Sequence, residues 1–444
     1  MFYRLVRSIV SMALGLFYRV EVVRRVQDFA GPVMFVGNHP NSLIDPAMVF
    51  MITDRQVTFL AREPLFRAPV LGWILRGVDA LPVYRKQDHP GLMAKNEGTL
   101  DAAAGALRDQ KAITIFPEGK SHSDPQLSDI KTGCARIALK AVKGGQALRI
   151  IPIGLTYAQK HLFRSRVLVE VGEPILVQAV GEQSEEAEQD WVRSLTNKVG
   201  EAMRKVTINL ETWEDLDLIQ TADRLFALRN GYREADSERL RLFARGASML
   251  RNHDPERFDD VKEDILNFHK RLEVVSANPS DLTAVNFEEK SMRTFVTRNI
   301  FSLVLGFPLF VLGMLLFFVP YYFLKALALA VPVSRDRVGT LKFISAVVMV
   351  PLWWSGLTVA AWSFWGIPGM VIALLGTMPL AVFTLYFLER RRAALGDIVT
   401  FFKLGNRNGL RKHLLSEGER LQEEIQRIVE ELKPKIEAEL RQLG

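Results

Sequence analysis

The sequence contains only one cysteine, Cys134, among its 444 residues. One thiol cannot form a disulfide within a chain or supply a multi-cysteine metal site, so both features are excluded. A lone cysteine is most often a small buried hydrophobic side chain, and we expect Cys134 to be one. The seven histidines are not clustered, and no motif for nucleic-acid recognition occurs. We therefore predict neither a bound metal nor a nucleic-acid partner.

Charged side chains are absent from two long stretches, residues 300–324 and 343–388. A bilayer core takes about 20 apolar residues per helix, so the first stretch can supply at least one crossing and the second two. We therefore predict an integral membrane protein with its transmembrane region at residues 298–392. Basic residues before, between and after the stretches favour two hairpins over three straight spans, the first reversing near Pro320 or re-entrant. This arrangement puts the active site on the cytoplasmic side.

What the sequence does contain is an imidazole and a carboxylate, His39 and Asp45, directly after the apolar run Val33-Met34-Phe35-Val36-Gly37. The run predicts a buried strand, and open α/β sheets place their chemistry at the carboxyl ends of such strands. Residues six apart cannot share a helix face, so the pair must meet across a turn at residues 40–42. An imidazole held by a carboxylate could accept a proton from a hydroxyl. A structural histidine bonded to a local aspartate is the alternative.

Three further blocks follow along the chain. Gly77 to Arg85 ends an apolar stretch with a guanidinium. Ala112 to His122 is a buried-strand pattern that stops at a Pro-Glu-Gly turn, and Leu148 to Thr156 is an apolar run with a proline inside. Together with the first block, and in this order, they resemble the motif set of the glycerolipid acyltransferase superfamily. This superfamily contains the lysophosphatidic acid and glycerol-3-phosphate acyltransferases.

Two features resemble one branch of that superfamily. Five residues, rather than four, separate His39 from Asp45. The third block, Phe116-Pro117-Glu118-Gly119-Lys120-Ser121-His122, lacks the arginine of the commoner pattern. Both features are similar to the fungal glycerol-3-phosphate and dihydroxyacetone-phosphate acyltransferases.

The resemblance implies an O-acyltransferase in which His39 is the general base and Asp45 fixes its tautomer, so that a glycerol hydroxyl attacks a fatty acyl thioester directly. The donor would be acyl-CoA or acyl-carrier protein, a co-substrate, and no cofactor is implied. The phosphorylated acceptor would be glycerol 3-phosphate, dihydroxyacetone phosphate or the lysophospholipid 1-acylglycerol 3-phosphate. A net charge of +7 suits these anionic partners and a lipid bilayer.

Substrate-binding residues follow from the same resemblance. A guanidinium at Arg85 could bind the acceptor phosphate through two hydrogen bonds, with Lys86 and Lys120 as weaker candidates. Glu118 and Gly119 correspond to positions that shape the acceptor pocket. The remaining members of the predicted substrate-binding set are Asn41 and Ser121, and the fourth block contributes shape rather than chemistry.

The apolar pattern predicts strands at Arg19–Val23, Val57–Leu60 and Val167–Val171, and helices at Leu92–Arg108 and Cys134–Val142. This alternation is typical of α/β domains. We expect an α/β acyltransferase domain over residues 20–183, with a mostly parallel sheet flanked by helices. A helical region over 184–297, with an apolar stripe from Phe258 to Leu272, and C-terminal transmembrane helices should follow it.

Two amphipathic segments flank these regions. Residues 1–19 carry a helical apolar stripe, which predicts a membrane-interface helix rather than a signal peptide, because no small-residue cleavage site precedes Arg19. In the tail, residues 393–444, apolar residues recur at helical spacing from Leu421 to Ile436, and this pattern predicts a cytoplasmic amphipathic helix. That repeat could form a short coiled coil, and hence a homo-oligomer, or lie against the membrane. Because Pro434 interrupts the repeat, packing of a solvated helix is the default expectation.

Two functions outside acyl transfer stay open from the sequence. A catalytically silent lipid-binding or scaffold protein could keep the fold, and the His–Asp spacing and the missing arginine motivate that alternative. A membrane-tethered acyl-thioester hydrolase is the other, because the same base could activate water.

Overall fold

The computed structural model describes residues 1–24, 31–85, 91, 94–143, 145–182, 184–232, 237–275, 277, 279, 289–334, 336–405 and 408–442. The chain forms two compact units, Met1–Asn209 with Pro332–Phe343, and Leu210–Val331 with Ile344–Gly444. The first unit contains the sheet, and the second is built from helices.

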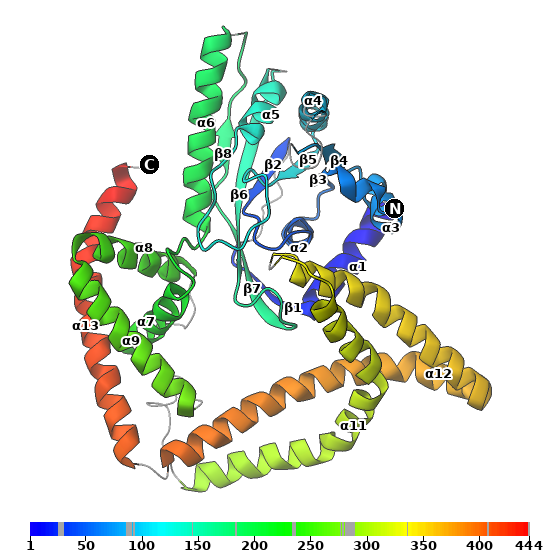
Figure 1. Ribbon diagram of the computed structural model, residues 1–444, viewed down its shortest axis with the longest axis vertical. Coiled ribbons are helices and arrows are strands. Elements are labelled where there is room, and N and C mark those ends of the chain that lie inside the picture. The colour runs from blue at the N-terminus through cyan, green and yellow to red at the C-terminus, as the bar shows by residue number, and fades with distance from the viewer. Residues whose placement is uncertain are drawn as a thin grey trace. The chain divides into compact units, whose positions relative to one another are not determined.

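An eight-stranded sheet forms the centre of the first unit, in the order β1-β7-β6-β2-β5-β3-β4, with β8 pairing to β6 (Figure 1). The strands are β1 Tyr18–Val22, β2 Val33–Gly37, β3 Val57–Arg62, β4 Leu81–Val83, β5 Ala112–Ile115, β6 Leu148–Tyr157, β7 Ser165–Val171 and β8 Ile175–Val177. Strands β6, β2, β5, β3 and β4 run parallel, whereas β7 and β8 are antiparallel to β6. The predicted mostly parallel sheet is confirmed, and five carboxyl ends meet at one edge.

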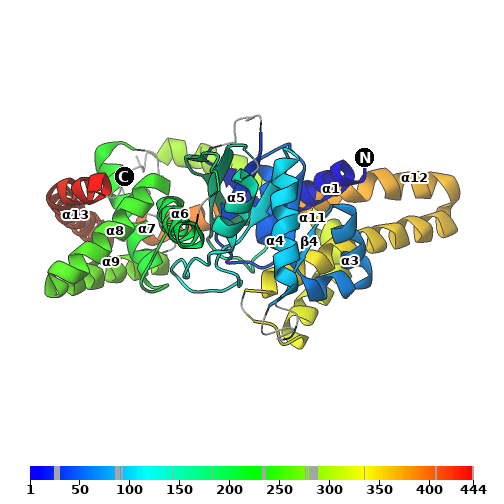
Figure 2. The ribbon, with the colours of Figure 1, turned by 90° about the horizontal axis from the view of Figure 1, so that it is seen from above.

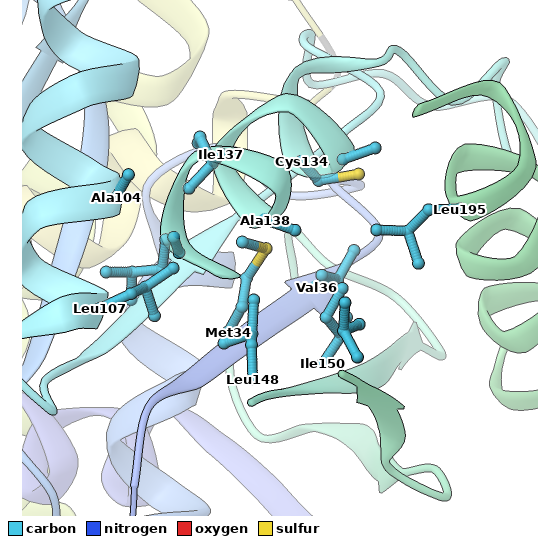
Figure 3. Packing of buried hydrophobic residues seen from close by; sticks show 14 of the residues in the cluster. Met34, Val36, Ala104, Leu107, Cys134, Ile137, Ala138, Leu148, Ile150 and Leu195 are labelled. Atoms are coloured by element: carbon cyan, nitrogen blue, oxygen red, sulfur yellow. The ribbon is translucent and has the colours of Figure 1, made fainter. Parts of the chain in front are cut away.

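Helices flank both faces of this sheet. The helical segments are α1 Phe2–Phe17, α2 Ile44–Met48, η1 Val49–Met51, η2 Glu63–Arg67, α3 Pro69–Gly77, α4 Lys95–Arg108, α5 Gly133–Val142 and α6 Glu185–Val206. Figure 3 shows Leu107 of α4, Ile137 of α5 and Leu195 of α6 gathered over Met34 and Val36 of β2. Side chains alternate along a strand, so Phe35 points to the opposite face. There, rings of α1, η1 and β3 pack edge to face.

Helix α6 belongs to the sheet unit, although the sequence pattern assigned it to the helical region that follows. Its Leu195, Val199 and Met203 join the apolar cluster beneath α5. The compact unit therefore continues to Asn209 instead of ending near residue 183. The remaining face of α6 is polar, and this polarity made the segment resemble the more exposed helices after it.

Cys134 lies in the same cluster and is fully buried, as predicted. Burial raises the pKa of its thiol to about 11, so the thiol stays protonated at pH 8. We expect N-ethylmaleimide to leave Cys134 unmodified in the folded protein and to modify it fully in denaturant, as measured by intact mass. Rapid modification of the folded protein would contradict this burial.

The second unit contains a bundle of α7 Asp215–Asn230, α8 Ser237–His253, α9 Pro255–Val275 and α13 Asn408–Gln442. The apolar stripe of α9 is buried in it, which confirms helix packing for Phe258 to Leu272. Leu421, Ile425 and Ile436 of α13 join the same cluster. Helix α13 also continues through Pro434. The apolar stripe of the C-terminal tail therefore packs against other helices of the same chain.

The two uncharged stretches form α11 Glu289–Ala330 and α12 Val338–Gly405. Segments Val304–Ala330 and Val338–Leu388 are long and apolar enough to cross a bilayer. Helix α12 reverses at Gly366 (φ 63°, ψ −153°), and Figures 1 and 2 show its two arms as a hairpin. Helix α11 changes direction but stays helical through Pro320. The first stretch is therefore one bent helix, without the reversal near Pro320 that the sequence pattern favours.

Candidate active site

His39 and Asp45 meet across the turn that follows β2. The Nδ1 atom of His39 lies 2.8 Å from Oδ2 of Asp45, whose carboxylate is fully buried. Ile44 N–H donates to the Asn41 carbonyl and begins α2, which brings Asp45 back toward the imidazole. The imidazole also stacks on Phe116 at a ring separation of 4.5 Å. With Nδ1 held by the carboxylate, Nε2 is the nitrogen that can receive a proton.

The Asp45 carboxylate has two more donors. The Asn41 N–H donates to Oδ2 at 2.6 Å, and the Tyr157 hydroxyl donates to Oδ1 at 2.7 Å. Burial and the negative charge of Asp45 raise the pKa of Tyr157 well above its usual value, so this hydroxyl stays protonated. Three hydrogen bonds thus fix the orientation of Asp45 and, through it, the imidazole ring.

Glu118 supports the other side of His39. Its side chain is 1% exposed, and Oε1 accepts a hydrogen bond from the His39 backbone N–H at 2.7 Å. Oε2 accepts from the Ser128 N–H at 3.0 Å and contacts Nε2 of His122. Because both oxygens face protein groups, Glu118 holds the backbone of His39 in place. His122, the last residue of the third block, therefore belongs to the same network.

Cationic side chains lie near the carboxyl ends of β4 and β5. Arg85 follows β4 and is half-buried, and the Asn96 side chain of α4 fixes the preceding residue, Tyr84, by two backbone hydrogen bonds. Lys120 is exposed beside Gly119, whose φ of 70° forms the turn. Predicted Lys86 lies outside the described residues. The parallel strands therefore bring predicted cations to the edge that carries His39.

Asn41 forms part of the turn that carries His39 and Asp45, and Ser121 contacts that turn. Asn41 is fully buried, and its amide donates to the Tyr18 hydroxyl at 3.1 Å. Ser121 Oγ accepts the Ser42 N–H at 3.0 Å, which ties the third block to the first. Ser42 adopts a φ of 49°, a conformation that few non-glycine residues hold without such support. Both predicted substrate-binding side chains thus serve the shape of the turn in this structure.

Sequence reasoning missed several residues of this edge. Tyr157 is the last residue of β6, the strand beside β2, and its position one residue beyond the fourth block was the available signal. Lys160 Nζ donates to the Pro40 carbonyl at 2.6 Å and to Ser123 Oγ at 2.7 Å. Burial lowers the pKa of Lys160. Lys131 was missed too, although its ammonium packs over Gly119, 2.7 Å from where a Cβ would lie.

Comparisons with known proteins agree with this geometry. The family model described as Acyltransferase matches residues 17–156, which contain β1 to β6 up to Thr156. Over 134 residues the chain is 36% identical to glycerol-3-phosphate O-acyltransferase 2 of Saccharomyces cerevisiae, covering 30% of this chain and 18% of the yeast protein. The family match and this relative support the glycerolipid acyltransferase superfamily for this domain.

Two further relatives of this acyltransferase domain are bacterial. The 1-acyl-sn-glycerol-3-phosphate acyltransferase of Streptococcus pneumoniae is 25% identical over 175 residues, 38% of this chain and 59% of that protein. The solved 1-acyl-sn-glycerophosphate acyltransferase of Thermotoga maritima is 20% identical, with 45% of this chain and 78% of that chain covered at a TM-score of 0.32. The chain thus spans under a fifth of the yeast relative and about three fifths of the pneumococcal one.

Proposed function

We propose that the protein is a membrane-bound O-acyltransferase of glycerolipid synthesis. The observation that carries this proposal is the buried Asp45–His39 pair at the carboxyl edge of the sheet, with Arg85 following β4 and Lys120 following β5 at the same edge. The donor is a fatty acyl thioester of coenzyme A or of acyl-carrier protein. The acceptor is glycerol 3-phosphate, dihydroxyacetone phosphate or 1-acylglycerol 3-phosphate. Relatives named for two of these acceptors support this substrate class.

The reaction needs one base and no covalent intermediate on the enzyme. Nε2 of His39 takes the proton of the acceptor hydroxyl, and its oxygen attacks the thioester carbonyl. The carbon–sulfur bond then breaks, and the leaving thiolate receives the proton from the imidazolium. Asp45 stabilises the imidazolium between these two steps and keeps Nδ1 protonated throughout. The products are the ester and the free thiol.

The acceptor's phosphate gives a direct test through Arg85. The purified protein is incubated with labelled oleoyl-CoA and each acceptor in turn, and the products are identified by mass. For the acceptor that is used, we expect Arg85→Ala to raise KM about 10- to 100-fold, because a charge-assisted bidentate hydrogen bond is lost. The KM of Arg85→Lys should lie between those of the wild type and Arg85→Ala, because the lysine ammonium is a point charge and lacks the planar fork of the guanidinium.

Arg166→Ala is the matched control, because this arginine of β7 is exposed and pairs only loosely, at 3.6 Å, with Glu21. It should leave KM unchanged. If Arg85→Ala behaves like Arg166→Ala, Arg85 does not bind the phosphate. Release of free oleate at the same rate with and without acceptor would show that the protein hydrolyses the thioester instead of transferring the acyl group. A protein that consumes no thioester would instead support the silent lipid-binding alternative.

Exposed apolar side chains of α1 and α3 support attachment to a lipid surface. Helix α1 buries Tyr3, Leu14 and Phe17 against its own unit. Large apolar side chains remain exposed on these helices, namely Leu5, Ile9, Met12, Leu16, Val70 and Trp73. The first four recur at helical spacing, as in a helix lying in a bilayer interface. Phe2 packs on Trp73 at 4.9 Å and joins the two helices into one surface.

The position of Pro332–Phe343 supports a hairpin-like membrane path. This segment belongs to the same compact unit as Met1–Asn209, and both should therefore lie on one side of the bilayer. The chain between them, which contains α11, would then cross the bilayer an even number of times or not at all. A bent α11 that enters and leaves on one side fits this requirement, as does the hairpin of α12. Basic clusters on that side favour the cytoplasm.

Single introduced cysteines test this path in sealed membrane vesicles, because native Cys134 is buried. We expect Glu185→Cys of α6 and Arg337→Cys to react with an impermeant maleimide from the same side. Ser363→Cys, near the reversal of α12, should be protected or react from the opposite side. Reaction of Arg337→Cys only from the side opposite to Glu185→Cys would establish three straight spans instead.

A further inference from the structure

The segment Pro332–Phe343 contains the connection between the two apolar helices and the first residues of α12, and it packs within the catalytic unit. Asp336 and Thr340 are buried, with 7% and 8% of their surfaces exposed. Lys342 Nζ donates to the His161 carbonyl at 3.0 Å, and the Phe343 ring meets Phe17 edge to face at 5.7 Å. Contacts of this number and burial are unusual for a plain connection between apolar helices. The segment therefore has a docked position.

The turn from Asn38 to Asp45 is the main surface that this segment contacts. The Thr340 hydroxyl donates to the Asn41 carbonyl at 3.1 Å, and the same carbonyl accepts the Ile44 N–H. The N–H of Asn41 in turn donates to Asp45, which holds His39. A continuous chain of hydrogen bonds thus leads from Thr340 to the imidazole through one backbone residue.

Gly339 and Asp336 extend this contact. A Cβ on Gly339 would lie 2.6 Å from the Lys160 carbonyl oxygen and 2.7 Å from Oδ1 of Asn41, so only glycine permits the close approach. Burial alone would raise the pKa of Asp336. Hydrogen bonds from Ser334 and Ser121 and the charge of Arg337 outweigh burial and hold that pKa below its usual value. Asp336 therefore stays ionised and accepts from the same Ser121 hydroxyl that receives the Ser42 N–H.

We propose that residues 336–340 are a positioning element of the acyltransferase site, which holds the Asn38–Asp45 turn in its reactive shape and couples it to the apolar helix α12. Thr340 acts through Asn41, Gly339 permits the contact, and Asp336 secures it through Ser121. None of these three touches the reacting atoms. The inference rests on the proposed acyl transfer, but the docking itself can be measured without activity.

The kinetic test uses Thr340→Val, which removes the hydroxyl at nearly constant volume. Loss of one buried hydrogen bond should lower kcat about 3- to 10-fold and leave the KM of the acceptor unchanged, because the phosphate-binding side chains are untouched. Thr340→Ser restores the donor and should restore kcat. Thr358→Val in the same helix is the matched control, because Thr358 bonds only to Trp354 of its own helix at 2.9 Å, and it should retain wild-type kcat.

The second test is hydrogen exchange of the peptide that contains Asn38 to Asp45, compared between wild type and Gly339→Val. We expect at least 10-fold faster exchange of this peptide in the variant, with exchange of α4 unchanged. Unchanged exchange together with unchanged kcat in Thr340→Val would overturn the proposal. If the wild type makes no ester with any acceptor, the proposed function fails. The exchange result then still decides whether the segment holds the turn.

Discussion

Replacement of His39 by alanine is expected to lower kcat by about 10²- to 10⁴-fold, the usual contribution of a general base. Nε2 of His39 is the proton acceptor in the proposed reaction, and the Asp45 carboxylate cannot replace it because it is fully buried. The KM of the acceptor should change little, since Arg85 is retained. The measurement is steady-state ester formation from labelled oleoyl-CoA at saturating acceptor.

The matched control for this prediction is His253→Ala, because His253 is an exposed histidine in the helical bundle. It should keep wild-type kcat. Full ester formation by His39→Ala would refute base catalysis by this residue, and the His39–Asp45 contact would then be structural. Asp45→Asn should also lower kcat, since an amide can present either an acceptor or a donor to Nδ1 and no longer stabilises the imidazolium.

Glu118→Ala is expected to have the largest effect on stability. It removes the acceptor of the His39 and Ser128 N–H groups and the partner of His122. Two backbone donors are left without an acceptor in a site where the side chain is 1% exposed. Each costs about 1–3 kcal/mol, so we expect the free energy of unfolding to fall by roughly 3–5 kcal/mol. Thermal unfolding followed by circular dichroism measures this loss as a lower Tm.

Glu118→Gln separates a structural role from a substrate contact. Its carbonyl oxygen can still accept from the His39 N–H, so it should recover part of the stability and part of kcat. Glu173→Gln, at a carboxylate that is 82% exposed, is the control and should leave Tm unchanged. If Glu118→Ala instead keeps the wild-type Tm and raises only the acceptor's KM, the residue contacts the acceptor.

Much of the α/β domain follows from local pattern. Short apolar runs gave β1, β3 and β7 to within a residue or two, and the Ala-rich stretch gave α4. The domain boundary after α6 and the path of α11 could not be predicted from local pattern. Helix α6 packs only one face on the sheet, and α11 continues through Pro320 instead of ending there. Both features depend on the elements that each helix packs against, and the residue pattern along the sequence does not identify those elements.

The candidate site divides in the same way. His39, Asp45 and Glu118 were predicted because each follows a readable strand or turn. Tyr157 and Thr340 were not, since they lie 112 and 299 residues from their partners.

The amino-acid sequence by itself determined the strand-and-turn blocks, the pairing of His39 with Asp45 and the apolar helices, because residue spacing and side-chain chemistry are local properties. Only the tertiary structure decided the strand order, the hydrogen bonds that orient Asp45, and the docking of Pro332–Phe343 on the turn from Asn38 to Asp45. These depend on contacts between residues far apart in the chain. Folding forms such contacts only when the whole unit closes around its core.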